Sequence, residues 1–348
     1  MATDVRPAAA AGPAATRPAS TWGQDLVTVL LATWLVVGVF VDGWAHNNLA
    51  SLETFFTPWH ALFYSGFAAT ACWVLATAGR VRQPGRSGLA AFPVGYGLAV
   101  VGVMVFAVGG AGDLTWHTMF GIEQDLEALF SPTHLLLFAG MALILSTPLR
   151  AAWSDPAAPA APGYRRFLPV LVSATLVTVL VAFAFLYWAA FIQTVGVVNY
   201  DDSQLLNDVA SVLATNLILL APLLLLSRRW RPPFGTATTI YGAVGVLIGA
   251  VDAFHLPAMI GAAVLAGLAV DGLLRLLAPS AGRPGRFWAA GAAVPLITWS
   301  IYFAAVAVTS GIGWSAELWT GTIAWSCLLG LVLSLLMLPP PFPGTTAD

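Results

Sequence analysis

The residues of this chain that could bind a metal or carry protons are concentrated in two stretches of similar sequence. In each stretch an aspartate precedes a histidine by four positions, and the pattern Glu-x-(Phe/Leu)-Phe-(Thr/Ser)-Pro-x-His then leads to a second histidine. The two copies hold four of the five histidines of the chain. Their aspartates and histidines are Asp42, His46 and His60 in the first copy and Asp113, His117 and His134 in the second.

One carboxylate and two imidazoles make a ligand set that suits copper, zinc, iron or manganese. An aspartate and a histidine four residues apart project from one face of a helix, so each copy could present its three groups at one depth. Glu53 and Glu127 precede the second histidines by seven positions and are candidate further ligands, or acceptors that orient an imidazole. Asp252 and His255 form a third acid–histidine pair.

A purely structural role for these residues is one alternative, because histidine and aspartate can form hydrogen bonds between helices inside a membrane. A proton relay is another. Charged groups at membrane depth are costly and tend to be functional. The repetition of one pattern in a chain with only 9% charged residues therefore favours a metal site or a proton relay over a structural role.

The composition predicts an all-α, polytopic membrane helix bundle. The chain has 348 residues, of which 59% are hydrophobic, and a mean hydropathy of +0.83. Apolar runs recur from residue 26 to residue 338, and about 20 apolar residues are enough to cross the bilayer core. Cys72 and Cys327 lie in separate apolar segments without a CxxC spacing, so we expect no disulfide framework.

Arginine supplies all 14 basic residues, and its clusters occur at every second loop between the apolar runs. Positively charged loops stay on the cytoplasmic side of a membrane. The distribution predicts about ten spans in the plasma membrane, with both termini cytoplasmic and the acid–histidine motifs facing outward. The clusters are Arg6 and Arg17; Arg80, Arg82 and Arg86; Arg150, Arg165 and Arg166; Arg228, Arg229 and Arg231; and Arg275, Arg283 and Arg286.

The predicted organisation has four parts. Residues 1–22 are a disordered cytoplasmic leader, and residues 23–149 hold the two motifs in two helical hairpins. Residues 150–338 form a six-helix membrane region, and residues 339–348 a cytoplasmic tail. Both hairpins run in–out–in, so we interpret them as a parallel repeat and expect their motifs to lie close together.

Helix-end signals place the second histidine of each motif. Threonine or serine followed by proline is a favourable helix start, so His60 and His134 are predicted in the first turn of the returning helices. A glycine follows each of these histidines by six positions, at Gly66 and Gly140. We expect the outgoing helices to end near residues 42 and 110, which leaves the first histidine of each motif in an outer loop.

At these residues the sequence resembles the C subunit of particulate methane and ammonia monooxygenases, which are copper-dependent membrane enzymes. The likeness lies in Asp-x-x-Trp-His, followed by an acid and by Phe-(Thr/Ser)-Pro-x-His at a helix start. It implies copper ligands near the outer membrane face. The implied ligands are Asp113, His117 and His134 for one site and Asp42, His46 and His60 for the other.

The leading functional hypothesis is an integral membrane metalloprotein with outward-facing sites, with copper as the expected metal and zinc or iron as alternatives. An oxidative activity would require further membrane subunits, and a homo-oligomer in the lipid bilayer is an alternative assembly. The rival hypothesis is a protein that transports or handles metal ions or protons without oxygenase activity, and a bis-histidine haem protein is a third. No phosphate-binding loop, Ser/His/Asp order or nucleic-acid patch is present in the sequence.

Overall fold

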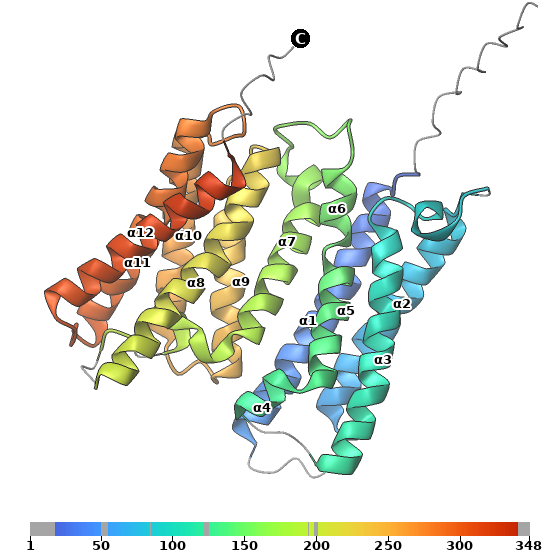
Figure 1. Ribbon diagram of the computed structural model, residues 1–348, viewed down its shortest axis with the longest axis horizontal. Helices are drawn as coiled ribbons and strands as arrows, with labels where there is room; N and C mark the ends of the chain where they lie inside the picture. The colour runs from blue at the N-terminus through green and yellow to red at the C-terminus, as the bar shows by residue number, and fades with distance from the viewer. Residues whose placement is uncertain are drawn as a thin grey trace, which may run out of the picture.

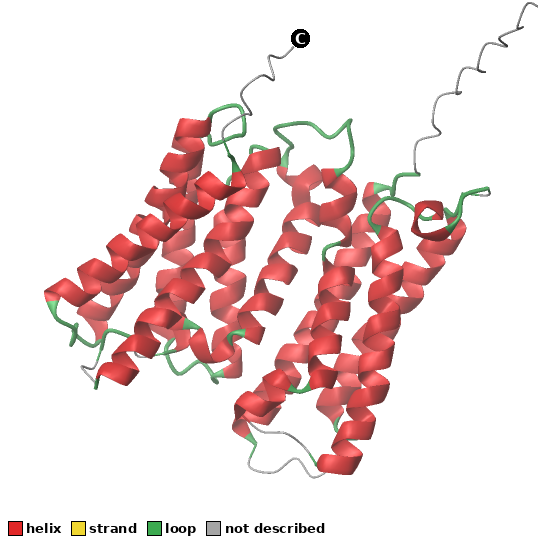
Figure 2. Cartoon of the chain, in the orientation of Figure 1, coloured by secondary structure: helices red, strands yellow, loops and turns green. Residues whose placement is uncertain are grey.

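The computed structural model describes residues 18–49, 55–83, 85–121, 125–193, 195–197 and 201–339, and these residues form helices joined by turns (Figure 2). The main helices are α1 (Trp22–Asn48), α2 (Pro58–Arg80), α3 (Tyr96–Phe120), α4 (Asp125–Phe130), α5 (Pro132–Leu145), α6 (Thr147–Trp153), α7 (Tyr164–Ala184), α8 (Asp202–Arg229), α9 (Thr236–Val251), α10 (Pro257–Leu277), α11 (Pro284–Thr309) and α12 (Ala316–Met337). Three short 3₁₀ helices are Gly88–Ala91, Leu186–Trp188 and Ala190–Ile192.

Most of these helices could cross a membrane. In the described part of the chain, eight are long and apolar enough, or nine if the bent pair α5 and α6 is one span. Helix α9 has 16 residues and is shorter than any of these eight helices. The structure therefore agrees with a multi-pass, all-α membrane protein, although length and hydropathy alone give fewer spans than the ten expected.

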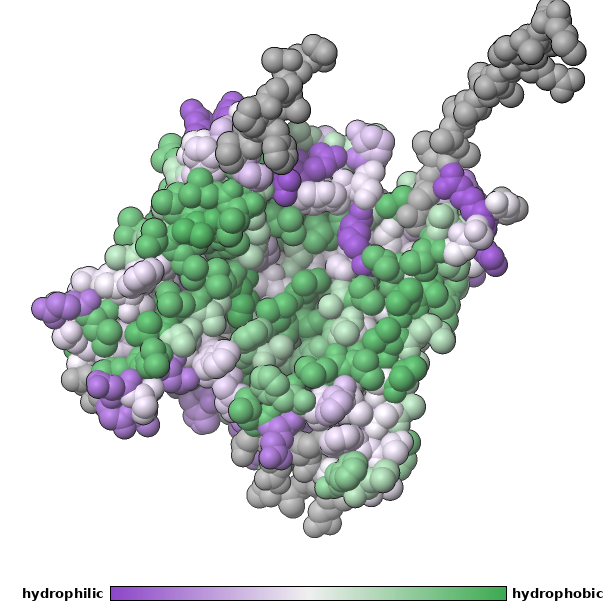
Figure 3. All heavy atoms as spheres, viewed as in Figure 1, coloured by the Kyte–Doolittle hydropathy of each residue, from purple (hydrophilic) through white to green (hydrophobic). Residues whose placement is uncertain are grey.

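The outer surface of the bundle fits a lipid environment. Figure 3 shows a hydrophobic band across the middle of the face in view and hydrophilic residues toward its two ends. Large apolar side chains of the membrane-length helices are exposed, among them Val108, Leu265 and Trp325 at 60% or more. Helix α12 is mostly exposed: only 28% of an apolar 18-residue stretch of this helix is buried inside the protein. A surface this apolar is unsuited to water and requires a bilayer or a protein partner.

The helices of each motif-bearing hairpin approach closely at glycines. A methyl carbon added at Gly66 on α2 would lie 2.8 Å from the Leu35 Cα on α1. A methyl carbon added at Gly140 on α5 would lie 2.7 Å from the backbone nitrogen of Phe106 on α3. The two glycines that follow the second histidines by six positions therefore allow the backbones of α1 and α2, and of α3 and α5, to come into contact.

The outgoing helices extend further than expected. Helix α1 continues to Asn48 and α3 continues to Phe120, so His46 and His117 are helical and not in outer loops. The expectation was wrong because polar residues alone do not end a helix, and neither motif contains a proline before its first histidine. A short helix, α4, lies in the connection between α3 and α5.

The returning helix of the second hairpin is bent. Helices α5 and α6 meet at Ser146 at an angle of 40°. Pro148 lies just after the break and cannot donate a backbone hydrogen bond. The Arg150 side chain donates to the carbonyls of Leu143 at 2.6 Å and Gly95 at 3.1 Å, which satisfies acceptors at the bend. The kink is therefore explained by Pro148, which interrupts the helical hydrogen bonds at this point.

Helix α7 lies between the first six helices and the last five (Figure 1). It ends at Ala184, and the chain then turns through two 3₁₀ helices. Tyr302 on α11 donates to the Ala190 carbonyl at 3.1 Å and fixes this turn. Phe183 packs edge-on against Phe40 of α1, with ring centroids 5.0 Å apart. The contacts of α7 therefore join the motif-bearing helices to the rest of the bundle.

Asp271 on α10 has a structural role: it caps the start of α9. Its carboxylate accepts hydrogen bonds from the backbone nitrogens of Ala237 and Thr238, both at 2.9 Å, and from the Thr238 hydroxyl at 2.6 Å. These donors form the first turn of α9, where backbone N–H groups lack helical partners. A carboxylate is also favoured there by the helix dipole. Asp271 thus caps α9 and is separate from the acid–histidine motifs.

Candidate metal centre

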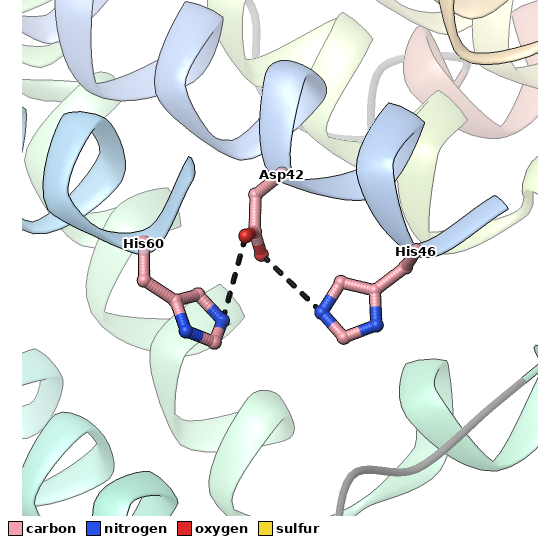
Figure 4. Close-up of side chains that lie close together, drawn as sticks. All are labelled: Asp42, His46 and His60. Atoms are coloured by element: carbon pink, nitrogen blue, oxygen red, sulfur yellow. Dashed lines mark ion pairs between the residues drawn. The ribbon is translucent and has the colours of Figure 1, made fainter. Parts of the chain in front are cut away.

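The first acid–histidine group is built from α1 and α2 (Figure 4). Asp42 and His46 are one helical turn apart on α1, and the His46 Nε2 lies 3.8 Å from an Asp42 oxygen. His60, in the first turn of α2, brings its Nε2 to 3.4 Å from the other Asp42 oxygen. The carboxylate therefore stands between two imidazoles, as the dashed lines in Figure 4 show. We refer to Asp42, His46 and His60 as the first triad.

The second group repeats this arrangement on α3 and α5. The Nε2 atoms of His117 and His134 lie 3.3 Å and 2.8 Å from Oδ1 of Asp113. This second triad, Asp113, His117 and His134, is the more enclosed at its acid, since the Asp113 side chain is 2% exposed and that of Asp42 is 14% exposed. In each triad, one ligand atom from every residue lies within 4.8 Å of the others.

The predicted helix starts are confirmed. The Thr57 hydroxyl accepts a hydrogen bond from the His60 backbone nitrogen at 3.1 Å. The Ser131 hydroxyl accepts one from the His134 backbone nitrogen at 3.4 Å. Proline follows each cap at the first helical position. Cap and proline together fix the direction of each returning helix, and so the place of its histidine.

Backbone carbonyls orient three of the four imidazoles. In each case the Nδ1 atom lies within hydrogen-bond distance of a carbonyl oxygen. A carbonyl can only accept, so Nδ1 must carry the hydrogen and donate it. In the neutral imidazole the lone pair is then on Nε2. The carbonyls belong to Phe55 for His60, at 2.6 Å, to Gly121 for His117, at 3.2 Å, and to Ala128 for His134.

These tautomers place lone pairs opposite negative oxygens. The Nε2 atoms of the same three histidines are the atoms that face Asp42 and Asp113. Two acceptors at this distance repel each other unless a cation lies between them, either a proton on Nε2 or a metal ion. The Oδ1 atoms of both aspartates are buried and form no hydrogen bond of acceptable geometry. Buried polar atoms without partners are costly, and a cation bound in either triad would satisfy these oxygens.

The separations favour a metal ion over a shared proton. Ligands held about 2.1 Å from a tetrahedral metal are roughly 3.4 Å from one another, whereas an N–H···O hydrogen bond is about 2.9 Å long. Three of the four nitrogen–oxygen distances in the triads are 3.3, 3.4 and 3.8 Å. Only the 2.8 Å distance from His134 to Asp113 equals a hydrogen bond. The residues present thus fit a three-ligand site with room for a further ligand.

The two triads are neighbours. Ring centroids are 5.9 Å apart between His46 and His60, 5.9 Å between His60 and His117, and 5.8 Å between His117 and His134. The expectation that the imidazoles of both motifs lie close together is confirmed. Phe55 contacts a histidine of each triad, with centroids 4.7 Å from His60 and 5.9 Å from His117.

Both triads also line one cavity of about 90 Å³. All the triad residues except His117 contribute to its wall, and the remainder of the wall is mainly apolar. Its apolar part comes from both halves of the chain and includes Val39, Phe63, Leu137, Phe138, Phe183 and Leu186. The cavity is large enough for a few atoms beside the metal ligands. A small molecule in it would contact ligands of either triad.

Of the other predicted site residues, Glu127, Asp252 and His255 lie outside the two triads. Glu53 lies outside the described residues. Glu127 is exposed on α4. The His255 Nδ1 lies 3.6 Å from Oδ1 of Asp252, and the His255 side chain is 71% exposed. Their turn is tied to α1, because Asn48 donates to the carbonyl of residue 251 at 2.8 Å.

Sequence reasoning missed one polar residue of the site. The Tyr64 hydroxyl donates to Oδ2 of Asp113 at 2.6 Å, although Tyr64 belongs to the hairpin of the first triad. Its position four residues after His60 was an available signal, since it puts both side chains on one face of α2. The pattern could not show that this face looks toward Asp113, because that contact crosses between hairpins.

Comparison with known proteins finds no match among protein-family models, curated proteins or solved structures. The resemblance to the copper monooxygenase C subunit therefore depends on the motif residues alone. What the structure adds is independent of that resemblance: two Asp/His/His groups with the geometry of metal ligands.

Proposed function

We propose that this chain is an integral membrane metalloprotein that holds one metal ion in each triad. The observation that carries the proposal is the orientation of His60, His117 and His134. Their Nδ1 hydrogens are donated to backbone carbonyls, and their Nε2 lone pairs face carboxylate oxygens. The Nε2–oxygen distances of His60 and His117, 3.4 and 3.3 Å, are typical of two ligands around one ion. The described side chains supply three ligands to each ion, which leaves a position for water or substrate.

We propose copper as the metal and an oxidative role as the activity. The support is the motif likeness to the C subunit of copper membrane monooxygenases, together with a ligand set that suits copper, zinc or iron. A bound copper ion would supply redox chemistry at the cavity wall. The chain's own residues would hold the ion, exclude bulk water with apolar side chains and leave a small space beside the ligands. Partner membrane subunits, or a second copy of this chain, belong to the same proposal.

We propose ten spans in the plasma membrane, with both termini cytoplasmic. Helix α1 begins and α12 ends at the same end of the bundle, which requires an even number of crossings (Figure 1). Counting α5 and α6 as one span and including α9 gives ten. At 1.5 Å per residue, α9 is about 24 Å long, close to the roughly 30 Å of the bilayer core. The arginine distribution supports the orientation. We also propose that the chain divides at residue 150 into the motif-bearing hairpins and a C-terminal six-helix membrane region.

The row of four imidazoles favours one rival function, the movement of protons or metal ions between the triads. Neighbouring rings are 5.8 to 5.9 Å apart throughout the row. In this alternative the cation between Nε2 and carboxylate is a proton, so each imidazole is charged. The two functions differ in what purified protein retains: a metalloprotein keeps bound ions, and a proton relay does not.

The test is the metal content of the detergent-purified chain after loading with copper, zinc or iron and removal of free ion. The proposal predicts two ions per chain, one for each triad. The variants Asp42→Asn and Asp113→Asn should each lose one ion, since a neutral amide is a poor ligand for these metals. Asp271→Asn is the matched control, because Asp271 is a buried aspartate that caps a helix far from the triads in sequence.

Retention of less than one ion by the unmodified, folded chain with all three metals would reject the metalloprotein proposal in favour of the proton relay. Equal loss of metal from Asp271→Asn would show that binding responds to general damage to the fold and not to the triads.

A further inference from the structure

The two triads differ in how their aspartate is held. Asp113 accepts a short hydrogen bond from the Tyr64 hydroxyl at Oδ2, while its Oδ1 faces His117 and His134. The carboxylate is therefore fixed in rotation, with one oxygen reserved for the cation. Among the described residues no hydroxyl donates to Asp42, which faces histidines with both of its oxygens. In the part of the chain that the structure describes, only the second triad has an acid that is oriented by a hydroxyl donor.

Tyr64 is itself held firmly. Its ring is packed between Phe55 at 5.6 Å, Phe63 at 5.0 Å and Phe106 at 6.1 Å, measured between ring centroids. A phenol whose ring is fixed on three sides loses little further freedom when its hydroxyl forms a hydrogen bond. Its hydrogen bond to a carboxylate is charge-assisted and is stronger than one between neutral groups.

The corresponding residue of the second copy is Phe138. Tyr64 follows His60 by four positions, and Phe138 follows His134 by four. Tyr64 reaches across from the first hairpin to the aspartate of the second. Phe138 lines the same cavity as Asp42, the aspartate of the first, but it has no hydroxyl to donate. This position therefore carries a hydroxyl donor in the first copy and none in the second.

We infer that Tyr64 is a positioning residue that makes the second triad the tighter of two unequal metal sites, so that the triads fill in order. This inference rests on the proposed function. Groups that orient a metal-bound carboxylate typically change metal affinity by about 10- to 100-fold. Asp113 also starts from the more enclosed position, which disfavours exchange of its ion with solvent. The second triad is therefore the resident site, and the first is the exchangeable site.

The test uses Tyr64→Phe, which removes the hydroxyl and keeps the ring. Each triad is measured alone, the second in the Asp42→Asn background and the first in the Asp113→Asn background, by competitive titration with Cu²⁺ and Zn²⁺. Tyr64→Phe should weaken the second triad by about 10- to 100-fold and change the first by less than about threefold. The Cu²⁺ electron paramagnetic resonance spectrum of the second triad should also change, because the carboxylate is free to rotate.

The reciprocal variant Phe138→Tyr adds a hydroxyl in the wall of the cavity that Asp42 also lines. It should tighten the first triad and leave the second unchanged. In the chain with both triads intact, combining Tyr64→Phe with Phe138→Tyr should reverse the filling order. A purely structural role of Tyr64 would not produce this reversal, and thermal unfolding of each variant shows whether the fold is intact. If Tyr64→Phe does not fold, Phe138→Tyr alone decides.

Unequal sites in the unmodified chain that do not respond to either variant would overturn the inference and leave the metalloprotein proposal standing. Absence of metal from both triads of the unmodified chain would instead reject the proposed function itself. Equal affinities of the two triads in the unmodified chain would also overturn the inference.

Discussion

The chemistry of each triad depends on which histidine nitrogen carries the hydrogen. Backbone carbonyls settle this for His60, His117 and His134 by accepting from Nδ1, which turns Nε2 toward the aspartate. An imidazole held in this way is prepared to bind a cation without rearrangement. The same arrangement makes protons competitors of the metal, because a metal ligand must be deprotonated.

Replacing His134 with alanine removes one of the three protein ligands of the second triad. We expect His134→Ala to lose about one bound ion per chain while the first triad keeps its own. Glu127→Gln is the matched control, because Glu127 precedes His134 in the same motif but its side chain is exposed. Metal analysis of both purified variants checks this. Full metal content in a folded His134→Ala variant would contradict the ligand role.

Acid should release the metal. Protonation of Nε2 destroys the lone pair that faces the metal, so affinity falls as the pH falls and is recovered as the pH rises. The expected result is a reversible loss of bound metal in mildly acidic buffer, with the far-ultraviolet circular dichroism of the helices unchanged. Dialysis at a series of pH values, followed by metal analysis, measures it. Release that increases toward alkaline pH would have the opposite sign to this account.

The sequence identified the candidate ligand residues, but it did not show which residues of other helices contact them. The six triad residues are recognisable from spacing alone, because four-residue spacing on a helix and a cap-plus-proline start are local features. Tyr64 was missed, and the Glu127 side chain is exposed on α4. The contact of Tyr64 with Asp113 joins separate helices, which one-dimensional spacing does not encode.

The helices hold the triads in register through close backbone contact. Gly66 and Gly140 lie where α1 meets α2 and where α3 meets α5. In a membrane, small residues at such crossings permit the packing that holds helices together. Helix existence and the starts at Thr57 and Ser131 were predictable from caps and apolar runs. The extension of α1 and α3 through their motifs was not, since it depends on the absence of a stop signal.

Adding a methyl group at these crossings should separate the helices. Gly66→Ala and Gly140→Ala would place a carbon 2.8 Å and 2.7 Å from backbone atoms of the partner helix. Overpacking of this kind costs about 1–3 kcal/mol. Gly79→Ala, also on α2, meets nothing within 4 Å and should be neutral or slightly stabilising. Thermal unfolding in detergent compares the three, and an equal effect of all three would contradict the close-contact role.

For the whole molecule, the arginine distribution predicts that the triads face outward. In a variant whose native cysteines are replaced, Met119→Cys at the triad end should react with a membrane-impermeant maleimide in intact cells. Phe234→Cys, between α8 and α9, should react only after lysis. Both positions are exposed, at 68% and 51% respectively, so reactivity reports the side of the membrane. Labelling of Phe234→Cys alone in intact cells would show that the chain has the opposite orientation in the membrane.

The C-terminal helices have a part in the site that the sequence did not reveal. Phe183 and Leu186 close the cavity that the triads share, and Phe183 packs against both Phe40 and Phe138. The apolar pattern of this region predicts membrane helices, but nothing in it indicates that α7 lies against the metal motifs. The structure therefore describes one bundle in which the second half completes the environment of the first.

The central claim is that metal ions lie between Asp, His and His in both triads. Anomalous diffraction from crystals of the copper- or zinc-loaded chain, collected on both sides of the metal absorption edge, tests it most directly. The account predicts two peaks, each about 2.0–2.2 Å from two Nε2 atoms and a carboxylate oxygen, in the first and second triads. Peaks elsewhere, or triads without a peak in a fully loaded crystal, would contradict it.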